Sequence, residues 1–281
     1  MNKILLIPNG NADKDFKVTR LVLDKLISLN LSVYISVQID YRGATVCDGV
    51  PEDIDLIIVV GGDGSVIDAA QLCVMRDIPI LGVNAGKVGY LATLDPENID
   101  LLSRLLTNEY GCEEMLLLSV EKHCCDGSIV TFDRLAVNDV VVSHDDYFGI
   151  SDFRVENSHG DHVEYRADGV IVATPQGSTA YSLSAGGPVI SHNLDSIMLT
   201  PICPHSFFNR AIVYGPDEKI KISNGADRPL NISIDGRLSS KLLPLEYCII
   251  GRSQRRLRMI SLNECNVFST LSKKIRLHGL V

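Results

Sequence analysis

A GGDGS run at residues 61–65 constrains this chain more than any other feature. An apolar stretch at residues 56–60 precedes it directly, and apolar residues at helical spacing follow it. This order predicts a buried strand, a glycine turn and a helix over residues 65–76. Because the glycines carry no Cβ atom, the backbone there can approach a ligand closely, and free amides at the start of the helix can face phosphate oxygens.

Asp63 is the one acid inside this turn. A carboxylate is out of place among amides if anion binding is their whole purpose. It is in place if it takes a proton from, or orients, a hydroxyl group that attacks a phosphoryl group. The alternative interpretation is an ordinary strand-to-helix turn in which Asp63 caps the helix.

The first part of the chain alternates apolar strands with helices, which is typical of a parallel sheet covered on both faces. We expect strands at 3–8, 33–39, 55–60 and 78–83, and helices at 14–29, 65–76 and 96–106. In such sheets ligands bind beyond the carboxyl ends of the strands, where the GGDGS turn and the loop at 84–90 both fall. The sequence therefore predicts an α/β nucleotide-binding domain with a mostly parallel sheet over residues 1–112.

After about residue 112 the pattern changes to short β-rich runs separated by turns. This predicts a second, β-rich domain over residues 113–265. The expected strands are 115–124, 129–143, 152–157, 169–173, 197–200, 211–214, 219–222, 230–234, 247–250 and 257–261. The basic cluster at 252–256 is interpreted as a solvated loop, and the tail at 266–281 as a helical or irregular segment that packs on the first domain.

Charge and cysteine usage narrow the class of protein. A net charge of −9 argues against nonspecific nucleic-acid binding, although local amides can still hold a phosphorylated small molecule. The eight cysteines form no CxxC pair, so we expect no zinc site and reduced thiols in the cytoplasm. Apolar runs stay below membrane-spanning length, which predicts no contact with a membrane.

Two stretches of the second domain carry polar residues where a β-rich domain does not need them. Asn138 and Asp139 fall inside the expected strand 129–143, so at least one of them faces the buried side and needs a partner. A ligand contact, a strand-end bulge and a solvent-facing pair are the alternatives. In residues 174–188, Ser178 and Thr179 are candidates to cap a short helix or bond a ribose, unless this segment is a flexible turn.

The chain resembles the NAD kinase family along nearly its whole length. GGDGS is similar to that family's GGDGT, and Asn138-Asp139 to its Asn-Glu/Asp pair. Four longer runs also resemble family segments: VNAGKVGYLAT at 83–93, RADGVIVATPQGSTAYSLSAGGPVI at 166–190, LTPICPHSF at 199–207 and SIDGR at 233–237.

The resemblance implies transfer of the terminal phosphoryl group of ATP, or of inorganic polyphosphate, to the adenosine 2′-hydroxyl of NAD, which gives NADP. A divalent cation, Mg²⁺ or Mn²⁺, is expected with the donor phosphates rather than on protein side chains alone. Partners are then NAD and ATP or polyphosphate, without nucleic acid or membrane, and the family forms homodimers and homotetramers.

The resemblance also assigns residues. Asp63 would be the catalytic residue that contacts the hydroxyl as base or positioner. Asn138 and Asp139 would hold the adenosine side, Asp168 and Ala180 the nicotinamide side. The implied substrate-binding set is Gly64, Tyr90, Asn138, Asp139, Asp168, Thr179, Ala180, Tyr181 and Ser184. The implied phosphate-donor set is Gly61, Gly62, Gly64 and Ser65.

Three positions depart from the family pattern: Ser65 stands where Thr is usual, Gln176 where Thr or Ser is usual, and Arg237 where Gln is common. Within the SIDGR segment, the resemblance assigns a site role only to Asp235.

The residues leave two other functions open: a GGDG-type lipid kinase of the diacylglycerol kinase kind and a non-catalytic NAD(P)-binding sensor. ATP against polyphosphate, NAD against NADH, feedback by NADP(H), and dimer against tetramer are not decided.

Overall fold

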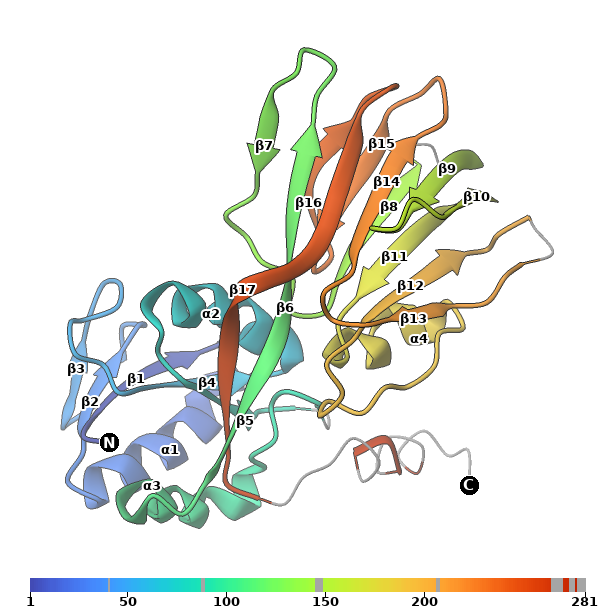
Figure 1. The fold of residues 1–281 in the computed structure, drawn as a ribbon. Coiled ribbons are helices and arrows are strands. Elements are labelled where there is room, and N and C mark those ends of the chain that lie inside the picture. Colours follow the sequence, from blue (N-terminus) through green and yellow to red (C-terminus); the bar gives the residue numbers. More distant parts are fainter. Residues whose placement is uncertain are drawn as a thin grey trace. The chain divides into compact units, whose positions relative to one another are not determined.

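The computed structural model describes residues 1–39, 41–86, 89–144, 149–205, 208–263, 270–272 and 276, and it divides into two compact units (Figure 1). Unit 1 comprises Met1–Met115 and Leu257–Val281, and unit 2 comprises Leu116–Arg256. The chain therefore returns to unit 1 at Leu257, earlier than the expected tail at 266–281. Of that tail, residues 266–269, 273–275 and 277–281 lie outside the described residues.

Unit 1 contains a parallel sheet whose strand order is β17-β5-β4-β1-β2-β3. These strands are β1 (Lys3–Pro8), β2 (Ser32–Ile35), β3 (Ala44–Val46), β4 (Leu56–Gly61), β5 (Ile80–Asn84) and the end of β17 (Tyr247–Ser261). Every residue of β4 and β5 is buried, as near-continuous apolar strands require when both faces of a sheet are covered. The predicted mostly parallel α/β sheet is confirmed.

The helices of unit 1 are η1 (Lys14–Phe16), α1 (Lys17–Ser28), α2 (Asp63–Arg76), η2 (Pro96–Ser103) and α3 (Arg104–Thr107). The predicted helix at 14–29 is wrong at its start, because Asp15 and Phe16 have positive φ angles of 58° and 53°. The amides of the first turn of α1 are satisfied by Asp13, whose carboxylate accepts the N–H groups of Val18 and Thr19. The regular helix therefore begins only at Lys17.

Unit 2 consists of the antiparallel part of the 11-stranded sheet that also contains the strands of unit 1, and of a second, six-stranded antiparallel sheet. The two share one apolar core. The first has the order β10-β9-β14-β17, with β6 paired to β17 and β7 to β6; the second has the order β13-β12-β11-β8-β15-β16. The strands of the first are β6 (Gly111–His123), β7 (Ile129–Thr131), β9 (Ser151–Glu156), β10 (His162–Ala167) and β14 (Lys219–Asn224). Those of the second are β8 (Asp139–His144), β11 (Gly169–Ala173), β12 (Ile197–Ile202), β13 (Ile212–Tyr214), β15 (Leu230–Ile234) and β16 (Arg237–Leu242).

The short helices η3 (Gln176–Thr179) and α4 (Tyr181–Ser184) follow β11. Val140 and Val142 of β8 enter the shared core, whereas Val141 packs in a separate cluster with Ile190 and Met198. The second sheet is therefore apolar on both faces near β8. This packing explains why β8 reads as a continuous apolar run instead of alternating.

Several sequence predictions for unit 2 are wrong in their limits. The expected strand 129–143 is two strands, since residues 132–138 separate β7 from β8. The basic cluster at 252–256 is not a loop but the middle of β17, where Arg252 pairs with Asp217 at 2.6 Å and Arg256 pairs with Asp195. Its charges are tolerated because these arginines lie on the outer side of the strand with acidic partners. The strands β3, β10 and β16 were not expected.

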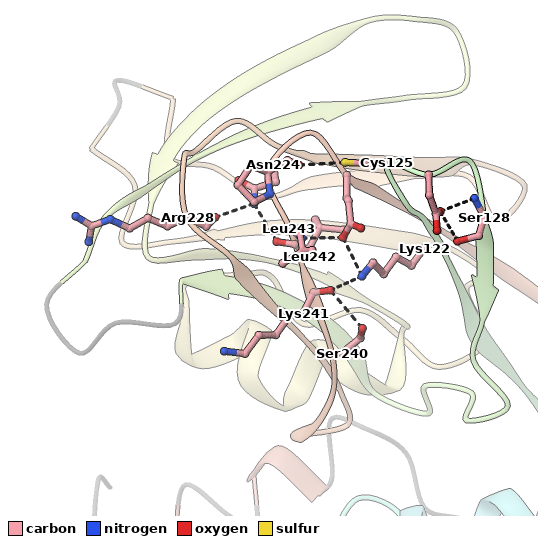
Figure 2. Close-up of polar contacts among 12 residues, drawn as sticks. Lys122, Cys125, Ser128, Asn224, Arg228, Ser240, Lys241, Leu242 and Leu243 are labelled. Atoms are coloured by element: carbon pink, nitrogen blue, oxygen red, sulfur yellow. Dashed lines mark hydrogen bonds and ion pairs between the residues drawn. The ribbon is translucent and has the colours of Figure 1, made fainter.

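A buried ion pair joins β6 to the turn that precedes β17 (Figure 2). The Nζ atom of Lys122 lies 2.8 Å from Glu246 and donates to the carbonyl of Lys241 at 2.7 Å, while Glu246 also accepts the amide of Leu243. Burial opposes ionisation of Glu246, but these hydrogen bonds and the charge of Lys122 outweigh it and lower the pKa of the carboxyl. Both side chains are almost fully buried, so neither can turn to water when the other is removed.

We expect Lys122→Met to lower the free energy of unfolding by about 3–5 kcal/mol, because it leaves the Glu246 carboxylate buried without its counter-ion. Lys25→Met is the matched control, since Lys25 pairs with an Asp100 that is 93% exposed. That control should cost less than about 1 kcal/mol. Urea denaturation measures both, and equal losses would contradict the assigned burial of the Lys122 pair.

Candidate active site

Asp63 is the first helical residue of α2, and its side chain does not cap the helix. The N-cap position is occupied by Gly62 in an extended conformation, without a side-chain cap hydrogen bond. The alternative of a simple capping aspartate is therefore wrong. The helix starts two residues earlier than predicted, which places the carboxylate in its first turn, where a negative charge is favourable.

The Asp63 carboxylate instead accepts three consecutive backbone N–H groups from the loop that follows β5. Oδ2 accepts the amide of Tyr90 at 2.9 Å, and Oδ1 accepts the amides of Leu91 at 2.8 Å and Ala92 at 3.1 Å. The side chain of Asp63 thus holds the backbone of residues 90–92 in place. The sequence placed this loop at the same sheet edge as the GGDGS turn, and these contacts bring the two together.

Gly89 is required by this arrangement. A Cβ atom at residue 89 would overlap Oδ1 of Asp63 and come within 3.0 Å of its Cγ. Because Gly89 has no side chain, the backbone beside Tyr90 can approach the Asp63 carboxylate closely. The ring of Tyr90 is partly buried beside the acid, and burial followed by the charge of Asp63 raises the pKa of its hydroxyl.

The glycines of the turn fall into two kinds. A Cβ on Gly61 would overlap Ser65, so the packing of the protein itself explains this glycine. A Cβ on Gly62 or on Gly64 would meet nothing within 4 Å, so packing does not explain either of them. These two positions are bare backbone that faces open space at the start of α2.

Asn9 belongs to this site, although the sequence analysis did not select it. Its Nδ2 donates to Oγ of Ser65 at 2.8 Å, and its own amide donates to Val60 at the end of β4. Ser65, an expected phosphate-donor residue, is therefore already held by the segment after β1. The available signal was position: an asparagine directly after a buried parallel strand lies at the edge where ligands bind.

In unit 2, Asn138 and Asp139 lie where β8 begins. Asp139 is 5% exposed and Asn138 is partly exposed, so at least one member of the pair faces inward, as expected. Asp235, which follows β15, accepts the amides of Val137, Asn138 and Asp139. The burial of Asp139 contradicts the alternative of a solvent-facing pair.

Burial, together with the charge of Asp235, raises the pKa of the Asp139 carboxyl to about 7. Burial also raises the pKa of Tyr181, and the charges of Cys203, Asp168 and Asp139 add to that rise. Two expected substrate residues of unit 2, Asp168 and Asp139, therefore both lie within electrostatic range of a third, Tyr181. Asp168 sits between β10 and β11, where its Oδ1 is 4.0 Å from Nε2 of His144.

Within the segment from Thr174 to Ser184, some expected site residues are buried and bonded within the protein, whereas others are exposed. Ser178 is completely buried and is bonded to Pro175 and Ile190, so it is neither a helix cap nor free to bond a ribose. Thr179 donates to Gln176, and Ala180 links η3 to α4. Tyr181 and Ser184 are exposed on α4. Gln176 is 3% exposed, and no partner for its Oε1 occurs in the described part of the chain.

No group of three or more His, Cys, Asp or Glu side chains that could hold a metal ion occurs among the described residues. Within the same residues, no helix combines the length and the apolar character needed to cross a membrane.

Comparison with known proteins covers both units. The model of the ATP-NAD kinase N-terminal domain matches residues 17–110, and that of the ATP-NAD kinase C-terminal domain matches residues 137–262. An NAD kinase of Lachnoclostridium phytofermentans is 32% identical over 285 residues, covering 98% of this chain and 99% of the relative. An NAD kinase of Caldanaerobacter subterraneus subsp. tengcongensis is 33% identical over 282 residues, with the same two coverages.

Solved structures are similar over the same extent. The NAD kinase from Archaeoglobus fulgidus in complex with ATP has a TM-score of 0.75 and 25% identity, covering 96% of this chain and 99% of that chain. Yeast NADH kinase complexed with NADH has a TM-score of 0.83, covers 97% of this chain and 86% of that chain, and at 19% identity supports the fold alone. The family models and the two relatives, which span both units, favour an NAD kinase over a lipid kinase.

We expect Asp139→Asn to stabilise the protein relative to wild type as the pH rises from about 5 to about 8. Folding raises the pKa of Asp139 to about 7, so its contribution to stability is present below its unfolded pKa and is lost as the pH rises through about 7. Asparagine cannot ionise, so the difference between variant and wild type should grow by a few kcal/mol over that range, on the order of 1.4 kcal/mol per unit of pKa shift.

Chemical denaturation at several pH values measures this difference. Asp53→Asn is the control, because Asp53 is an exposed carboxylate whose φ angle of 59° also suits asparagine. If the difference in free energy of unfolding between Asp139→Asn and wild type varies with pH no more than that of the control, Asp139 is not a buried acid.

Proposed function

Because this chain belongs to the NAD kinase family, we propose that it transfers the terminal phosphoryl group of ATP or polyphosphate to the adenosine 2′-hydroxyl of NAD, with Asp63 receiving that hydroxyl. The observation that carries the assignment of Asp63 is the set of three amide hydrogen bonds that fix its carboxylate. Phosphoryl transfer requires mainly accurate positioning of the nucleophile and compensation of charge. A carboxylate locked in one orientation supplies the first of these.

The hydrogen-bond pattern also selects one oxygen of Asp63. A carboxylate offers about four acceptor positions, two on each oxygen. Oδ1 accepts two amides and is fully used, whereas Oδ2 accepts only the amide of Tyr90. We therefore assign the remaining acceptor position on Oδ2 to the reacting hydroxyl of the substrate.

The donor phosphates are assigned to the start of α2. Gly62 and Gly64 leave backbone bare toward open space, and the free amides of a helix N-terminus attract anions. Gly61 and Ser65 support this turn from inside, since Gly61 packs on Ser65 and Ser65 is bonded to Asn9. In this proposal Gly61 and Ser65 shape the donor site, while Gly62 and Gly64 provide room for the phosphates.

A divalent cation, Mg²⁺ or Mn²⁺, fits this site as a companion of the donor phosphates. The described residues contain no acidic cluster able to hold a metal, and Mg²⁺ commonly binds through substrate phosphates, waters and one or two carboxylates. When bound, such an ion offsets the negative charge of the phosphates. Asp63 would then face a neutralised donor rather than a repelling one.

The chemical step needs no covalent intermediate on the protein. The 2′-oxygen of the ribose forms a bond to the terminal phosphorus while the bond from that phosphorus to the bridging oxygen breaks, which releases ADP or a shortened polyphosphate. The hydroxyl proton passes toward Oδ2 of Asp63. The residues of this chain bind, orient and accept the proton, and the products are NADP and the remainder of the donor.

The rest of the dinucleotide is assigned to Tyr90 of unit 1 and to the polar residues of unit 2. Asn138 and Asp139 are proposed for the adenosine side, and Asp168 with Ala180 for the nicotinamide side. Tyr181 supports this grouping, because the charges of both Asp139 and Asp168 reach its hydroxyl. Thr179 and Ser184 complete the proposed set on η3 and α4.

We also propose that the enzyme works in the cytoplasm as a homodimer or homotetramer, as the family resemblance implies. The cysteines that support a reducing compartment are free in the described part of the chain. Size-exclusion chromatography with light scattering distinguishes the dimer from the tetramer.

An NADP-forming assay tests the proposed function. The purified protein is incubated with Mg²⁺, with ATP or polyphosphate as donor and with NAD, NADH or diacylglycerol as acceptor. We expect NADP or NADPH with at least one donor. Phosphorylation of diacylglycerol alone, or NAD binding without product under any condition, would exclude the proposal in favour of a lipid kinase or a sensor respectively.

Asp63→Asn should lower kcat by about two orders of magnitude or more while NAD still binds, because the variant loses the acceptor for the hydroxyl proton. Calorimetry with NAD and steady-state kinetics measure the two effects separately. Full activity in this variant would remove Asp63 from the mechanism.

Gly89→Ala should also lower kcat, by at least about tenfold, because the new methyl group displaces the Asp63 carboxylate from its three amides. Gly215→Ala is the control, since a Cβ there meets nothing within 4 Å. Wild-type turnover in Gly89→Ala would mean that the orientation of Asp63 is not important for the reaction.

A further inference from the structure

We propose that Asp235 is a positioning residue that fixes the backbone of the adenosine-binding pair Asn138 and Asp139 and sets the electrostatic environment of Asp139. This inference rests on the proposed function, because it assigns Asp235 a task in binding NAD. Asp235 itself does not contact the substrate in this account. It acts through the two residues that do.

The turn that carries Asp235 restricts which residue can stand there. Asp235 and Gly236 form the two-residue connection between β15 and β16, in which Ile234 pairs with Arg237. Their φ angles are 49° and 72°, and a hairpin turn with two positive φ angles accepts mainly Asn, Asp and Gly. Of these three, only Asp combines the turn with a pair of acceptor oxygens.

The side chain of Asp235 uses both oxygens on a single strand start. Oδ2 accepts the amide of Val137 at 3.0 Å, and Oδ1 accepts the amides of Asn138 at 2.8 Å and Asp139 at 3.2 Å. The amide of Asp235 in turn donates to the carbonyl of Asp139 at 3.0 Å. The contact is therefore reciprocal and holds the backbone at the point where β8 begins.

The opposite side of the same backbone is held by the segment after β11. The carbonyl of Asn138 accepts the amide of Thr174 at 2.9 Å, and the Thr174 hydroxyl donates to the carbonyl of Val137 at 2.6 Å. Gly177 lies so close to the carbonyl of Asn138 that any Cβ there would overlap it. With its main chain fixed on both sides, Asn138 keeps a side-chain amide that has no partner within the described residues.

Electrostatics gives Asp235 a second effect on the pair. Among the described residues, the charged and titratable groups that act with Asp139 are Asp235 from the β15–β16 turn and Tyr181 from α4. Burial raises the pKa of Asp235, and its three backbone hydrogen bonds and the charge of Arg134 oppose that rise. Burial, with the charge of Asp235 beside it, raises the pKa of Asp139 to about 7. Removing that negative charge should lower the pKa of Asp139, whichever protonation state binds the substrate.

Two variants test the proposal. Asp235→Asn keeps the turn and removes the charge, and Asp235→Gly keeps the turn and removes the whole side chain. We expect both to raise KM for NAD by at least about tenfold, with kcat changed by less than about threefold and KM for ATP unchanged. Asp126→Asn is the matched control, because Asp126 also bonds a backbone amide from a turn of unit 2, that of Ser128.

The pH profile of kcat/KM for NAD separates positioning from a merely structural role. The ionisation of Asp139 is identified as the one that Asp139→Asn abolishes. In Asp235→Asn its midpoint should move to lower pH by about half a unit or more, whereas a general loss of structure lowers the whole profile without moving the midpoint.

Each outcome has one meaning. An unchanged KM for NAD with an unmoved midpoint would overturn the proposal, and a lowered melting temperature in that case would assign Asp235 to structure alone. A wild-type protein that forms no NADP would instead refute the proposed function. Normal turnover in wild type with unaffected variants would refute only the role of Asp235.

Discussion

One interaction underlies both parts of the candidate site: an aspartate carboxylate that accepts the N–H groups of consecutive residues on a distant segment. Asp63 holds residues 90–92 in this way, and Asp235 holds residues 137–139. Consecutive amides can converge on one anion only when the backbone bends sharply. The acid therefore selects the bent conformation, and without it three amide donors would lack their partner, at a cost of about 1–3 kcal/mol for each one that is buried.

These hydrogen bonds explain how residues 90–92 and residues 137–139 are held in place by a side chain rather than by regular secondary structure. The loop after β5 and the residues before β8 lie outside helices and, up to Asn138, outside strands. Their geometry comes from one side chain on a neighbouring element, and glycines at 89 and 177 permit the close approach. Rigid placement of polar groups on such loops is what positional catalysis demands.

The local part of this structure could be predicted from the sequence. The strand, glycine turn and helix around Asp63 follow from hydrophobic periodicity and from Gly61, Gly62 and Gly64, because each signal is carried by neighbouring residues. The α/β character of unit 1 and the β-rich character of unit 2 follow in the same way. The family was indicated by runs such as the one at 166–190, and the comparisons agree.

Partners far apart in the sequence could not be predicted. Asn9 is bonded to Ser65 across 56 positions, and Asp235 to Val137 across 98, and no periodicity reports such pairings. The role of the arginines of β17 was wrongly predicted because their acidic partners lie on distant connecting segments, such as Asp217 in the turn before β14. At α1 the cause of the error is local instead, because the positive φ angles of Asp15 and Phe16 override helical spacing. The predicted strand limits were wrong where tertiary contacts, rather than local propensity, end the strand.

The bare backbone at Gly62 and Gly64 has a consequence for how this protein tolerates change. A methyl group at either position meets no neighbouring side chain or distant backbone of the described residues within 4 Å, so folding exerts little selection against it. In laboratory evolution for expression or heat resistance, alanine and serine will accumulate there unnoticed. If the proposed donor site is right, only a screen that measures product will retain these glycines, because they would then matter in the complex with the phosphate donor and not in the free polypeptide.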